Sequence, residues 1–298
     1  TLCGYRLEVM SNFPDMSNAF SIEAPAKTNL WLRILGKRKD GFHEIETRMV
    51  KISLADQLRL KWREDDSVVL QCSNSELPTG EENLVIKAVR ALEKHCGKIF
   101  AISIDLDKRI PLGAGLGGGS SDAAAVLKAI NKMAGLELSE GELAKIGATI
   151  GSDIPFFLFG GPCDCRGRGE IVEPVDERLP RGEIFLMKPA FAISAGWAYK
   201  QFAESCTYEG FSYEPQESSW GALVNDLERP VFGKYPVLGG MKNWLKEQPG
   251  VQAALMSGSG STMLAMIESD AIGVELTGAV TERYGENCWT WCGRTLEA

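Results

Sequence analysis

The sequence is poor in the positive charge that marks several classes of binding protein. Its 298 residues contain 32 lysines and arginines against 40 aspartates and glutamates, so the net charge is -8 at pH 7. Proteins that bind nucleic acids or anionic membranes in general carry an excess of positive charge, and this composition disfavours both classes. An anionic ligand must therefore be held by a local site, built from backbone N–H groups and a few lysines.

The sequence also lacks the common patterns of metal-binding and disulfide-stabilised proteins. There are two histidines, and the eight cysteines include no C-x-x-C pair. The pairs Cys163/Cys165 and Cys288/Cys292 have no second Cys or His pair at zinc-finger spacing. Scattered cysteines in a chain of this length indicate a reducing compartment, and we expect a cytoplasmic protein.

Long hydrophobic runs are missing as well. The longest uncharged stretch, residues 248–267, contains Pro249 and a run of glycine and serine, whereas a membrane-spanning helix needs about 20 mainly apolar residues. Residues 1–20 carry charges and no apolar run of the kind found in secretory signals. We therefore expect no membrane segment, and we interpret residues 1–20 as an N-terminal extension.

What remains is the composition of an ordinary globular protein, with 44% hydrophobic and 24% charged residues and a length typical of about two domains. Alternating apolar residues predict strands at 21–35, 47–60, 67–72, 101–106, 184–188, 253–256 and 263–267. Helical spacing predicts helices at 84–96, from Ser120 or Ser121 onward, and at 139–150, 220–227, 237–248 and 271–284. Residues 151–161 and 205–219 are expected to form loops. This partial segregation of strands and helices favours an α+β fold.

The strongest local signal is the segment Pro111–Asp122, with the sequence PLGAGLGGGSSD. Its five glycines lie between a predicted strand and a predicted helix. Glycine allows positive φ angles and close approach of the backbone to a ligand, and a helix N-terminus adds partial positive charge. The segment is therefore predicted to bind phosphate groups without side-chain charge. A flexible linker is the alternative, which its place before a helix disfavours.

Two well-known nucleotide motifs do not explain this segment. Gly113, Gly115 and Gly118 fit G-x-G-x-x-G, but that motif belongs in the first βαβ unit of a dinucleotide-binding fold. Here about 110 residues of strand-rich chain come first. A P-loop requires Gly-Lys followed by Ser or Thr, and the three Gly-Lys pairs are followed by Arg, Ile and Tyr.

Three segments in order resemble the motifs of the GHMP small-molecule kinases. They are Pro25–Leu30 (PAKTNL), Pro111–Asp122 and Ser257–Thr262 (SGSGST). Shorter matches are GFH at 41–43, ENL at 82–84, DKRIP at 107–111, GSDIPFF at 151–157 and NDLE at 225–228. Each motif is modest alone, but their joint order is highly specific.

The resemblance implies an α+β fold of two domains and an ATP-dependent kinase that uses Mg2+. Residues 21–170 would form an ATP-binding domain like domain 2 of ribosomal protein S5. Residues 171–298 would form a ferredoxin-like domain that contributes to the substrate site. The chain is most similar to the branch that phosphorylates the 2-hydroxyl of a methylerythritol carried on cytidine diphosphate, in non-mevalonate isoprenoid synthesis. Mevalonate, homoserine or a sugar is the alternative substrate, but none of these has a cytosine for the GFH segment to bind.

The resemblance also implies two catalytic residues, Lys27 and Asp153. Asp153 would orient the acceptor hydroxyl and accept its proton late in the transfer. Lys27 would stabilise this carboxylate and the transferring phosphate. Judged by local sequence alone, Asp153 is an ordinary turn residue and Lys27 an exposed strand lysine.

Binding residues follow from the same resemblance. The ATP site would comprise Asn83, Lys108, Pro111, Leu112, Gly113, Ala114, Gly115, Leu116, Gly117, Gly118, Gly119, Ser120 and Ser121. Either serine hydroxyl is a candidate to reach Mg2+. The substrate site would comprise Asn29, Phe42, His43, Asp153, Tyr199, Gly258, Ser259 and Gly260. A simple hairpin turn is the alternative for the last three.

Two positions depart from the family pattern. Asp122 stands where asparagine is common, which adds negative charge near the expected phosphates. Ala195 stands where many members have threonine, so that a substrate hydrogen bond is lost or is made by Ser194 instead.

Overall fold

The structure is a computed structural model that describes residues 8–9, 19–175 and 181–296, so most of the expected N-terminal extension lies outside the described residues. The chain divides into two compact units, and neither is continuous in sequence. The first unit contains residues up to Pro25, Ala55–Arg109 and Gly118–Phe159. The second contains Ala26–Leu54, Ile110–Gly117 and residues from Gly160 onward. The division into domains 21–170 and 171–298 stays a prediction.

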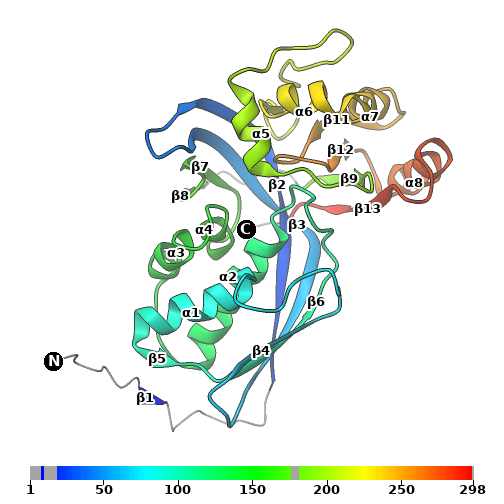
Figure 1. Ribbon diagram of the computed structural model, residues 1–298. Helices are drawn as coiled ribbons and strands as arrows, with labels where there is room; N and C mark the ends of the chain where they lie inside the picture. Colours follow the sequence, from blue (N-terminus) through cyan, green and yellow to red (C-terminus); the bar gives the residue numbers. More distant parts are fainter. Residues whose placement is uncertain (1–7, 10–18, 176–180, 297–298) are drawn as a thin grey trace. The chain divides into compact units, whose positions relative to one another are not determined.

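The first unit is a sheet with helices packed on one face (Figure 1). Its strands are β4 (Val68–Cys72), β6 (Ile102–Asp107) and the last part of β3 (His43–Trp62). β6 runs parallel to β4 and antiparallel to β3. Every second residue of β6 is buried, as expected for a sheet with one covered face. A short parallel pair joins β1 (Glu8–Val9) and β5 (Lys98–Ile99).

The helices of the first unit are α1 (Leu84–Cys96), α2 (Gly118–Met133), α3 (Glu140–Ala148) and the short α4 (Ile154–Leu158). Asn83 caps α1 by accepting a hydrogen bond from the Val85 N–H at 2.9 Å. Ser139 and Glu142 form a reciprocal capping box on α3. Both caps confirm the predicted starts of these helices.

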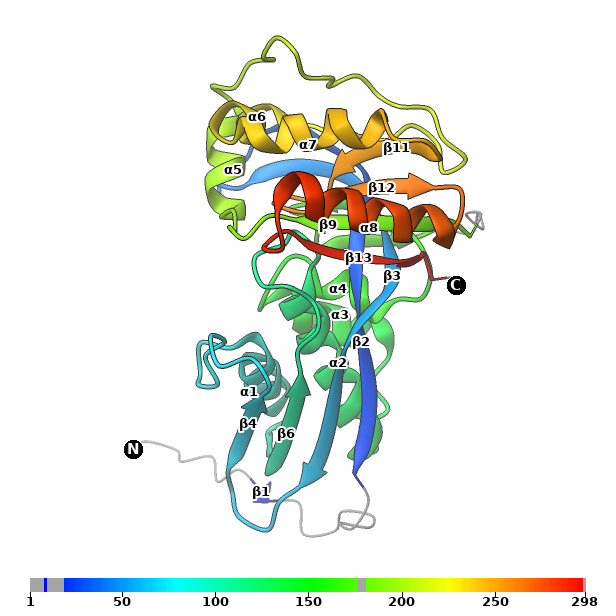
Figure 2. The same cartoon turned by 90° about the vertical axis from the view of Figure 1, so that its right-hand side faces the viewer.

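The first part of the second unit is built on two long strands, β2 (Phe20–Lys37) and β3, which pair with each other. β3 also pairs with β7 (Cys163–Gly167), which pairs with β8 (Ile171–Pro174). The short β10 (Val224–Asn225) runs parallel to β2 at Trp31 and Leu32. Figure 2 shows the length of β2 and β3.

A second sheet lies in the C-terminal half, in the order β11 (Val251–Met256), β12 (Met263–Ile267), β9 (Glu183–Lys188), β13 (Trp289–Arg294). All its neighbouring strands are antiparallel. Helices α5 (Ala195–Phe202), α6 (Glu228–Lys234) and α7 (Pro236–Lys246) follow β9, and α8 (Asp270–Tyr284) follows β12. This chain order and strand order are those of a ferredoxin-like fold, as predicted.

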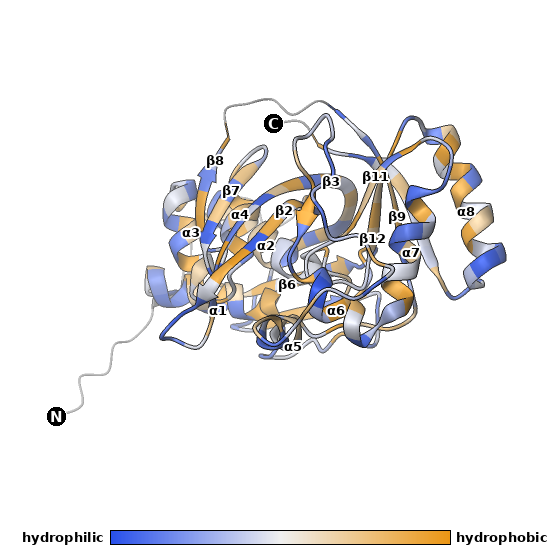
Figure 3. Ribbon diagram, turned by 90° about the horizontal axis from the view of Figure 1, so that it is seen from above, coloured by the Kyte–Doolittle hydropathy of each residue, from blue (hydrophilic) through white to orange (hydrophobic). Residues whose placement is uncertain are grey.

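The core of this second sheet uses both of its faces. Phe185 and Met187 of β9 join one buried apolar cluster, and the alternate residues Ile184 and Leu186 join another. The fully buried strand therefore reads as a continuous apolar run rather than an alternation. In Figure 3, α8 shows both hydrophobic and hydrophilic turns, and its Val274 is 74% exposed.

Several local predictions were wrong. The helix predicted at 220–227 is instead a turn and strand β10, and α6 begins only at Glu228. The predicted loop at 151–161 contains α4. α2 begins at Gly118, so the serines at 120 and 121 lie in its first turn rather than at its N-cap. α5 was not predicted. Nowhere in the described residues is a helix both long and apolar enough to cross a membrane.

Candidate active site

The glycine-rich segment adopts a backbone that side chains would obstruct. Gly113, Gly115 and Gly117 have φ angles of 58°, 75° and 71°, in the left-handed region that glycine adopts without strain. A Cβ atom on Gly115 would lie 2.2 Å from the Ser257 carbonyl oxygen. The segment therefore requires glycine for both its conformation and its packing. Residues from Gly118 onward form the first turn of α2, whose N-terminus adds partial positive charge.

Residues 257–262, here called the third-motif turn, connect β11 to β12 and pack against the glycine-rich segment. The Ser257 hydroxyl donates to the Gly115 carbonyl at 3.2 Å, and the Thr262 N–H donates to the Ala114 carbonyl at 3.4 Å. Gly258 has a φ angle of 54°. The segment is therefore a hairpin turn that also packs against the glycine-rich segment, and its place in the substrate site stays a prediction.

Lys27 is buried beside this turn. Its side chain lies on β2 with 4% of the residue exposed, so the structure rules out an exposed strand lysine. Its Nζ donates to Asn29 Oδ1 at 2.8 Å, and Asn29 Nδ2 donates to the Thr47 hydroxyl at 2.7 Å. A Cβ atom on Gly258 would lie 3.2 Å from Lys27 Nζ and 3.4 Å from Asn29 Oδ1. The third-motif turn thus lies directly against the Lys27–Asn29 pair.

Asp153 occupies the N-cap position of α4 in the first unit, whereas Lys27 belongs to the second. The Asp153 side chain makes no capping hydrogen bond to the helix. Pro155 stands in the first turn, where a missing N–H costs nothing. The Asp153 carboxylate therefore does not cap the helix, as turn aspartates commonly do.

An aromatic site forms around the turn that joins β2 and β3. The rings of His43 and Tyr199 stack with their centroids 5.8 Å apart at an interplanar angle of 25°. The Phe42 side chain is half exposed, and the Arg168 guanidinium lies 4.8 Å from its ring centroid. Burial, together with the positive charge of Lys37, lowers the pKa of His43. A neutral imidazole suits hydrogen bonding to an uncharged ring.

Lys108 is buried between two carboxylates of the first unit. Its Nζ forms ion pairs with Asp56 and, at 2.7 Å, with Asp122, and at most 3% of each of these side chains is exposed. Asp56 Oδ1 also accepts the Arg109 N–H at 2.6 Å. Burial, opposed by the Lys108 charge and reinforced by Asp56, raises the pKa of Asp122 to about 7. Two carboxylates and one cation leave an excess negative charge in this cluster, which a proton on Asp122 neutralises.

Asp56 was missed in the sequence. A signal was present, because Asp56 occupies a buried position in the alternation of β3, between the buried Leu54 and Leu58. A charged residue at such a position requires a partner. The alternation alone did not identify Lys108 as that partner, since the two residues are 52 positions apart.

The remaining candidate residues are placed by local contacts. Asn83 caps α1, and Ser121 is buried with its hydroxyl donating to the Pro25 carbonyl at 2.7 Å. Ala195 is the first residue of α5, and the Ser194 hydroxyl caps that helix by accepting the Trp197 N–H at 3.3 Å. Ser120 is partly exposed in the first turn of α2.

Comparison with known proteins identifies two family domains in this chain. The GHMP kinases N terminal domain matches residues 83–161, and the GHMP kinases C terminal domain matches residues 213–286. The first match includes the glycine-rich segment and Asp153. The second includes the third-motif turn.

Similar proteins agree with this assignment. The 4-diphosphocytidyl-2-C-methyl-D-erythritol kinase of Methylacidiphilum infernorum is 38% identical over 94% of this chain and 98% of its own length. The enzyme of the same name from Syntrophus aciditrophicus is 39% identical over 84% of this chain and 90% of its own. A crystal structure of 4-(cytidine 5'-diphospho)-2C-methyl-D-erythritol kinase, 31% identical, covers 93% of this chain and 99% of that one with a TM-score of 0.77. The chain therefore belongs to the GHMP kinases, and within them to the 4-diphosphocytidyl-2-C-methyl-D-erythritol kinase family.

Proposed function

We propose that this protein transfers the γ-phosphate of ATP to the 2-hydroxyl of 4-diphosphocytidyl-2-C-methyl-D-erythritol, a step of non-mevalonate isoprenoid synthesis. The observation that carries the proposal is the combination of a glycine-built phosphate site with the His43–Tyr199 ring stack. The first feature suits a triphosphate, and the second suits a nucleobase. The names of the related proteins supply the identity of the alcohol.

ATP is bound in this proposal by the backbone of Pro111–Ser121. Positive φ angles at three alternate glycines suit a backbone whose N–H groups converge on an anion, and the N-terminus of α2 adds partial positive charge. Asn83 and the backbone at Lys108 would lie near the adenine and ribose. The Lys108 ammonium is already paired with two carboxylates, so we assign its side chain to holding the segment rather than to contacting phosphate.

Asp153 and Lys27 carry the chemistry. Asp153 orients the acceptor hydroxyl for in-line attack and accepts its proton as the new O–P bond forms and the bond to ADP breaks. The buried Lys27 stabilises the negative charge on the transferring phosphoryl group. Asn29 holds the Lys27 ammonium at 2.8 Å and thereby fixes where this charge is applied.

The cytosine of the substrate is held by aromatic side chains. His43 offers ring nitrogens for hydrogen bonds, and Tyr199 and Phe42 offer faces for stacking. The third-motif turn, with Gly258, would approach the substrate diphosphate.

Mg2+ fits this site as a companion of the nucleotide. Among the described residues, no cluster of three or more His, Cys, Asp or Glu could hold a metal ion. Mg2+ is commonly held by substrate phosphates with one or two protein oxygens, and Ser120 lies beside the expected phosphates. When bound, the cation would neutralise charge on the β- and γ-phosphates. A cytoplasmic location remains the expectation from the cysteine pattern.

Other GHMP kinases share the fold. A mevalonate kinase from Methanococcus jannaschii covers 94% of this chain with a TM-score of 0.70, but at 14% identity this likeness concerns the fold alone. The aromatic site distinguishes the candidates, because mevalonate, homoserine and sugars have no base to stack.

A kinase assay that offers each alcohol separately with ATP and Mg2+ tests the proposal. We expect ADP release to depend on the cytidyl alcohol, and Asp153→Ala to lower kcat by about 100-fold or more while ATP affinity changes little. Turnover with mevalonate or homoserine alone would overturn the proposed substrate. An unchanged kcat in Asp153→Ala would overturn the role of the carboxylate.

A further inference from the structure

Strand β11 lies at the edge of the C-terminal sheet, and side chains from residues 216–228 bind its outer backbone. Gln216 Nε2 donates to the Ala254 carbonyl at 2.7 Å, and Gln216 Oε1 accepts the Ala254 N–H at 3.1 Å. Two residues further along β11, Glu228 Oε1 accepts the Met256 N–H at 2.9 Å. These side chains satisfy backbone groups that an edge strand would otherwise leave unpaired.

Asn225 extends this pattern from the strand into the third-motif turn. Its Nδ2 donates to the Met256 carbonyl and to the Gly258 carbonyl, each at 2.7 Å. Its Oδ1 accepts the Leu227 N–H at 2.9 Å, so all three bonds fix the orientation of the amide. Asn225 is 2% exposed and is anchored by the parallel pairing of β10 with β2.

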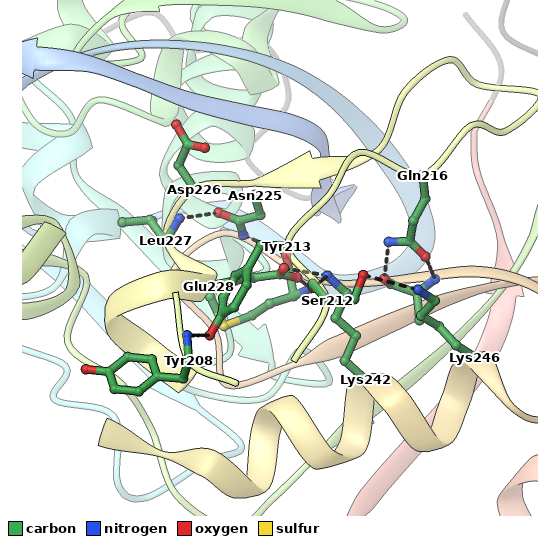
Figure 4. Close-up of polar contacts among 12 residues, drawn as sticks. Tyr208, Ser212, Tyr213, Gln216, Asn225, Asp226, Leu227, Glu228, Lys242 and Lys246 are labelled. Atoms are coloured by element: carbon green, nitrogen blue, oxygen red, sulfur yellow. Dashed lines mark hydrogen bonds and ion pairs between the residues drawn. The ribbon is translucent and has the colours of Figure 1, made fainter. Parts of the chain in front are cut away.

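Glu228 and Lys242 form a buried ion pair that supports the hydrogen bonds to β11. Lys242 Nζ pairs with Glu228 Oε2 at 2.5 Å and donates to the Ser212 carbonyl at 2.8 Å. Both side chains are at most 2% exposed. Figure 4 shows Asn225, Glu228 and Lys242 meeting in this network, with Gln216 bonded separately at its far end.

The Asn225 bond to the Gly258 carbonyl matters because Lys27 and Gly115 pack against that glycine. A Cβ atom there would approach Lys27 Nζ to 3.2 Å and the Gly115 carbonyl to 2.9 Å. The Gly258 peptide, which Asn225 holds, is thus packed against Lys27, the proposed catalytic lysine. A displacement of this turn would change the surroundings of the ammonium while leaving every side chain assigned to ATP or to cytosine in place.

We infer that Asn225 is a positioning residue, which holds the third-motif turn at Gly258 and thereby sets the environment of Lys27 for phosphoryl transfer. This inference rests on the proposed function. It assigns to Asn225 no contact with substrate or nucleotide.

Gln216 provides a matched control. Gln216→Ala removes two amide hydrogen bonds, both to Ala254 of the edge strand. Asn225→Ser weakens or removes three, to Met256, Gly258 and Leu227, and only the bond to Gly258 reaches the turn. We expect Asn225→Ser to lower kcat by roughly 10- to 100-fold, the usual cost of a small misplacement of a reacting group. The KM for ATP and the calorimetric affinity for cytidine, which lacks the diphosphate that the turn would approach, should stay within about twofold. Gln216→Ala should keep the wild-type kcat.

Hydrogen exchange of the amides at 257–262 gives a readout that does not depend on turnover. We expect faster exchange there in Asn225→Ser than in wild type or in Gln216→Ala. Gly258→Ala, which displaces the turn from its other side, should reproduce the loss of kcat. A wild type that fails to phosphorylate the cytidyl alcohol would defeat the proposed function, and the exchange data would still test the structural part of the inference.

Three results would overturn the inference. The first is equal loss of kcat in Asn225→Ser and Gln216→Ala, which would indicate a general effect on the sheet. The second is unchanged exchange at 257–262 in Asn225→Ser. The third is failure of Asn225→Ser to fold where Gln216→Ala folds, since the bonds would then serve the fold and not the turn.

Discussion

Replacing Asp122 by asparagine should change how the stability of this protein depends on pH. Asp122 shares the Lys108 ammonium with Asp56, and burial raises the pKa of Asp122 to about 7. A raised carboxyl pKa means that the folded state binds a proton more tightly than the unfolded state does. The stabilisation is therefore complete below the ordinary pKa near 3.8 and is lost as the pH rises through about 7.

The size of the effect follows from the two pKa values. At 1.36 kcal/mol for each unit of pKa, the rise from 3.8 to about 7 is worth roughly 4 kcal/mol in unfolding free energy. Most of that change falls between pH 5 and pH 8, where the wild type should lose roughly 3 kcal/mol through this group. Asparagine resembles the protonated acid in shape and carries no charge, so the variant should lack this dependence.

Urea unfolding at several pH values between 5 and 8 measures the difference directly. We expect the advantage of Asp122→Asn over the wild type in unfolding free energy to grow by roughly 3 kcal/mol between pH 5 and pH 8. Asp105→Asn, on the exposed face of β6, makes the same change of charge in contact with water and serves as the control. It should follow the wild-type curve within about 0.5 kcal/mol.

Two outcomes would refute this reasoning. Parallel curves for wild type and Asp122→Asn would mean that the carboxyl stays ionised throughout the range. A variant that is less stable than wild type at pH 8 would mean that the charge of Asp122 is needed to hold Lys108.

Three further substitutions test other parts of the structure. Gly115→Ala places a Cβ 2.2 Å from a carbonyl oxygen of the third-motif turn at a positive φ angle, so calorimetry with a non-hydrolysable ATP analogue should show a large loss of affinity, and wild-type affinity would speak against the phosphate site. Tyr199→Ala removes the ring that stacks on His43 and should weaken CDP binding by roughly 5- to 100-fold, the worth of one stacked base, whereas unchanged binding would place the base elsewhere. Lys242→Met leaves the buried Glu228 carboxylate unpaired and should cost about 3–5 kcal/mol in denaturant unfolding, a figure that a near-neutral result would contradict.

Local signals in the sequence predicted much of the fold. Asn83, Ser139 and Glu142 predicted the starts of two helices because caps act within one turn of chain. Alternation predicted most strands for a similar reason, since neighbouring residues of a strand point to opposite faces.

Predictions failed where distant contacts decide the structure. Residues 220–227 have apolar residues at helical spacing, but pairing with β2 and the Asn225 bonds to β11 favour an extended chain there. The partnership of Asp56, Lys108 and Asp122 also depends on three separate elements. Neither arrangement leaves a short-range pattern that periodicity can detect.

In the candidate site, too, local signals were predicted and long-range contacts were not. The positive φ angles of the glycine-rich segment were predicted from its own residues, because glycine adopts such angles without strain. The roles of Lys27, Asp153 and His43 came only from the resemblance to GHMP kinases and stay predictions. The burial of Lys27 beneath Gly258 could be found only in the folded chain.

The most direct test of the proposed reaction follows the γ-phosphorus of ATP by 31P NMR in the presence of Mg2+ and the cytidyl alcohol. We expect the γ resonance to be replaced by that of a phosphomonoester on the alcohol in the wild type, and to persist in Asp153→Ala over the same time. Release of inorganic phosphate without the monoester, or equal transfer by the variant, would contradict the account.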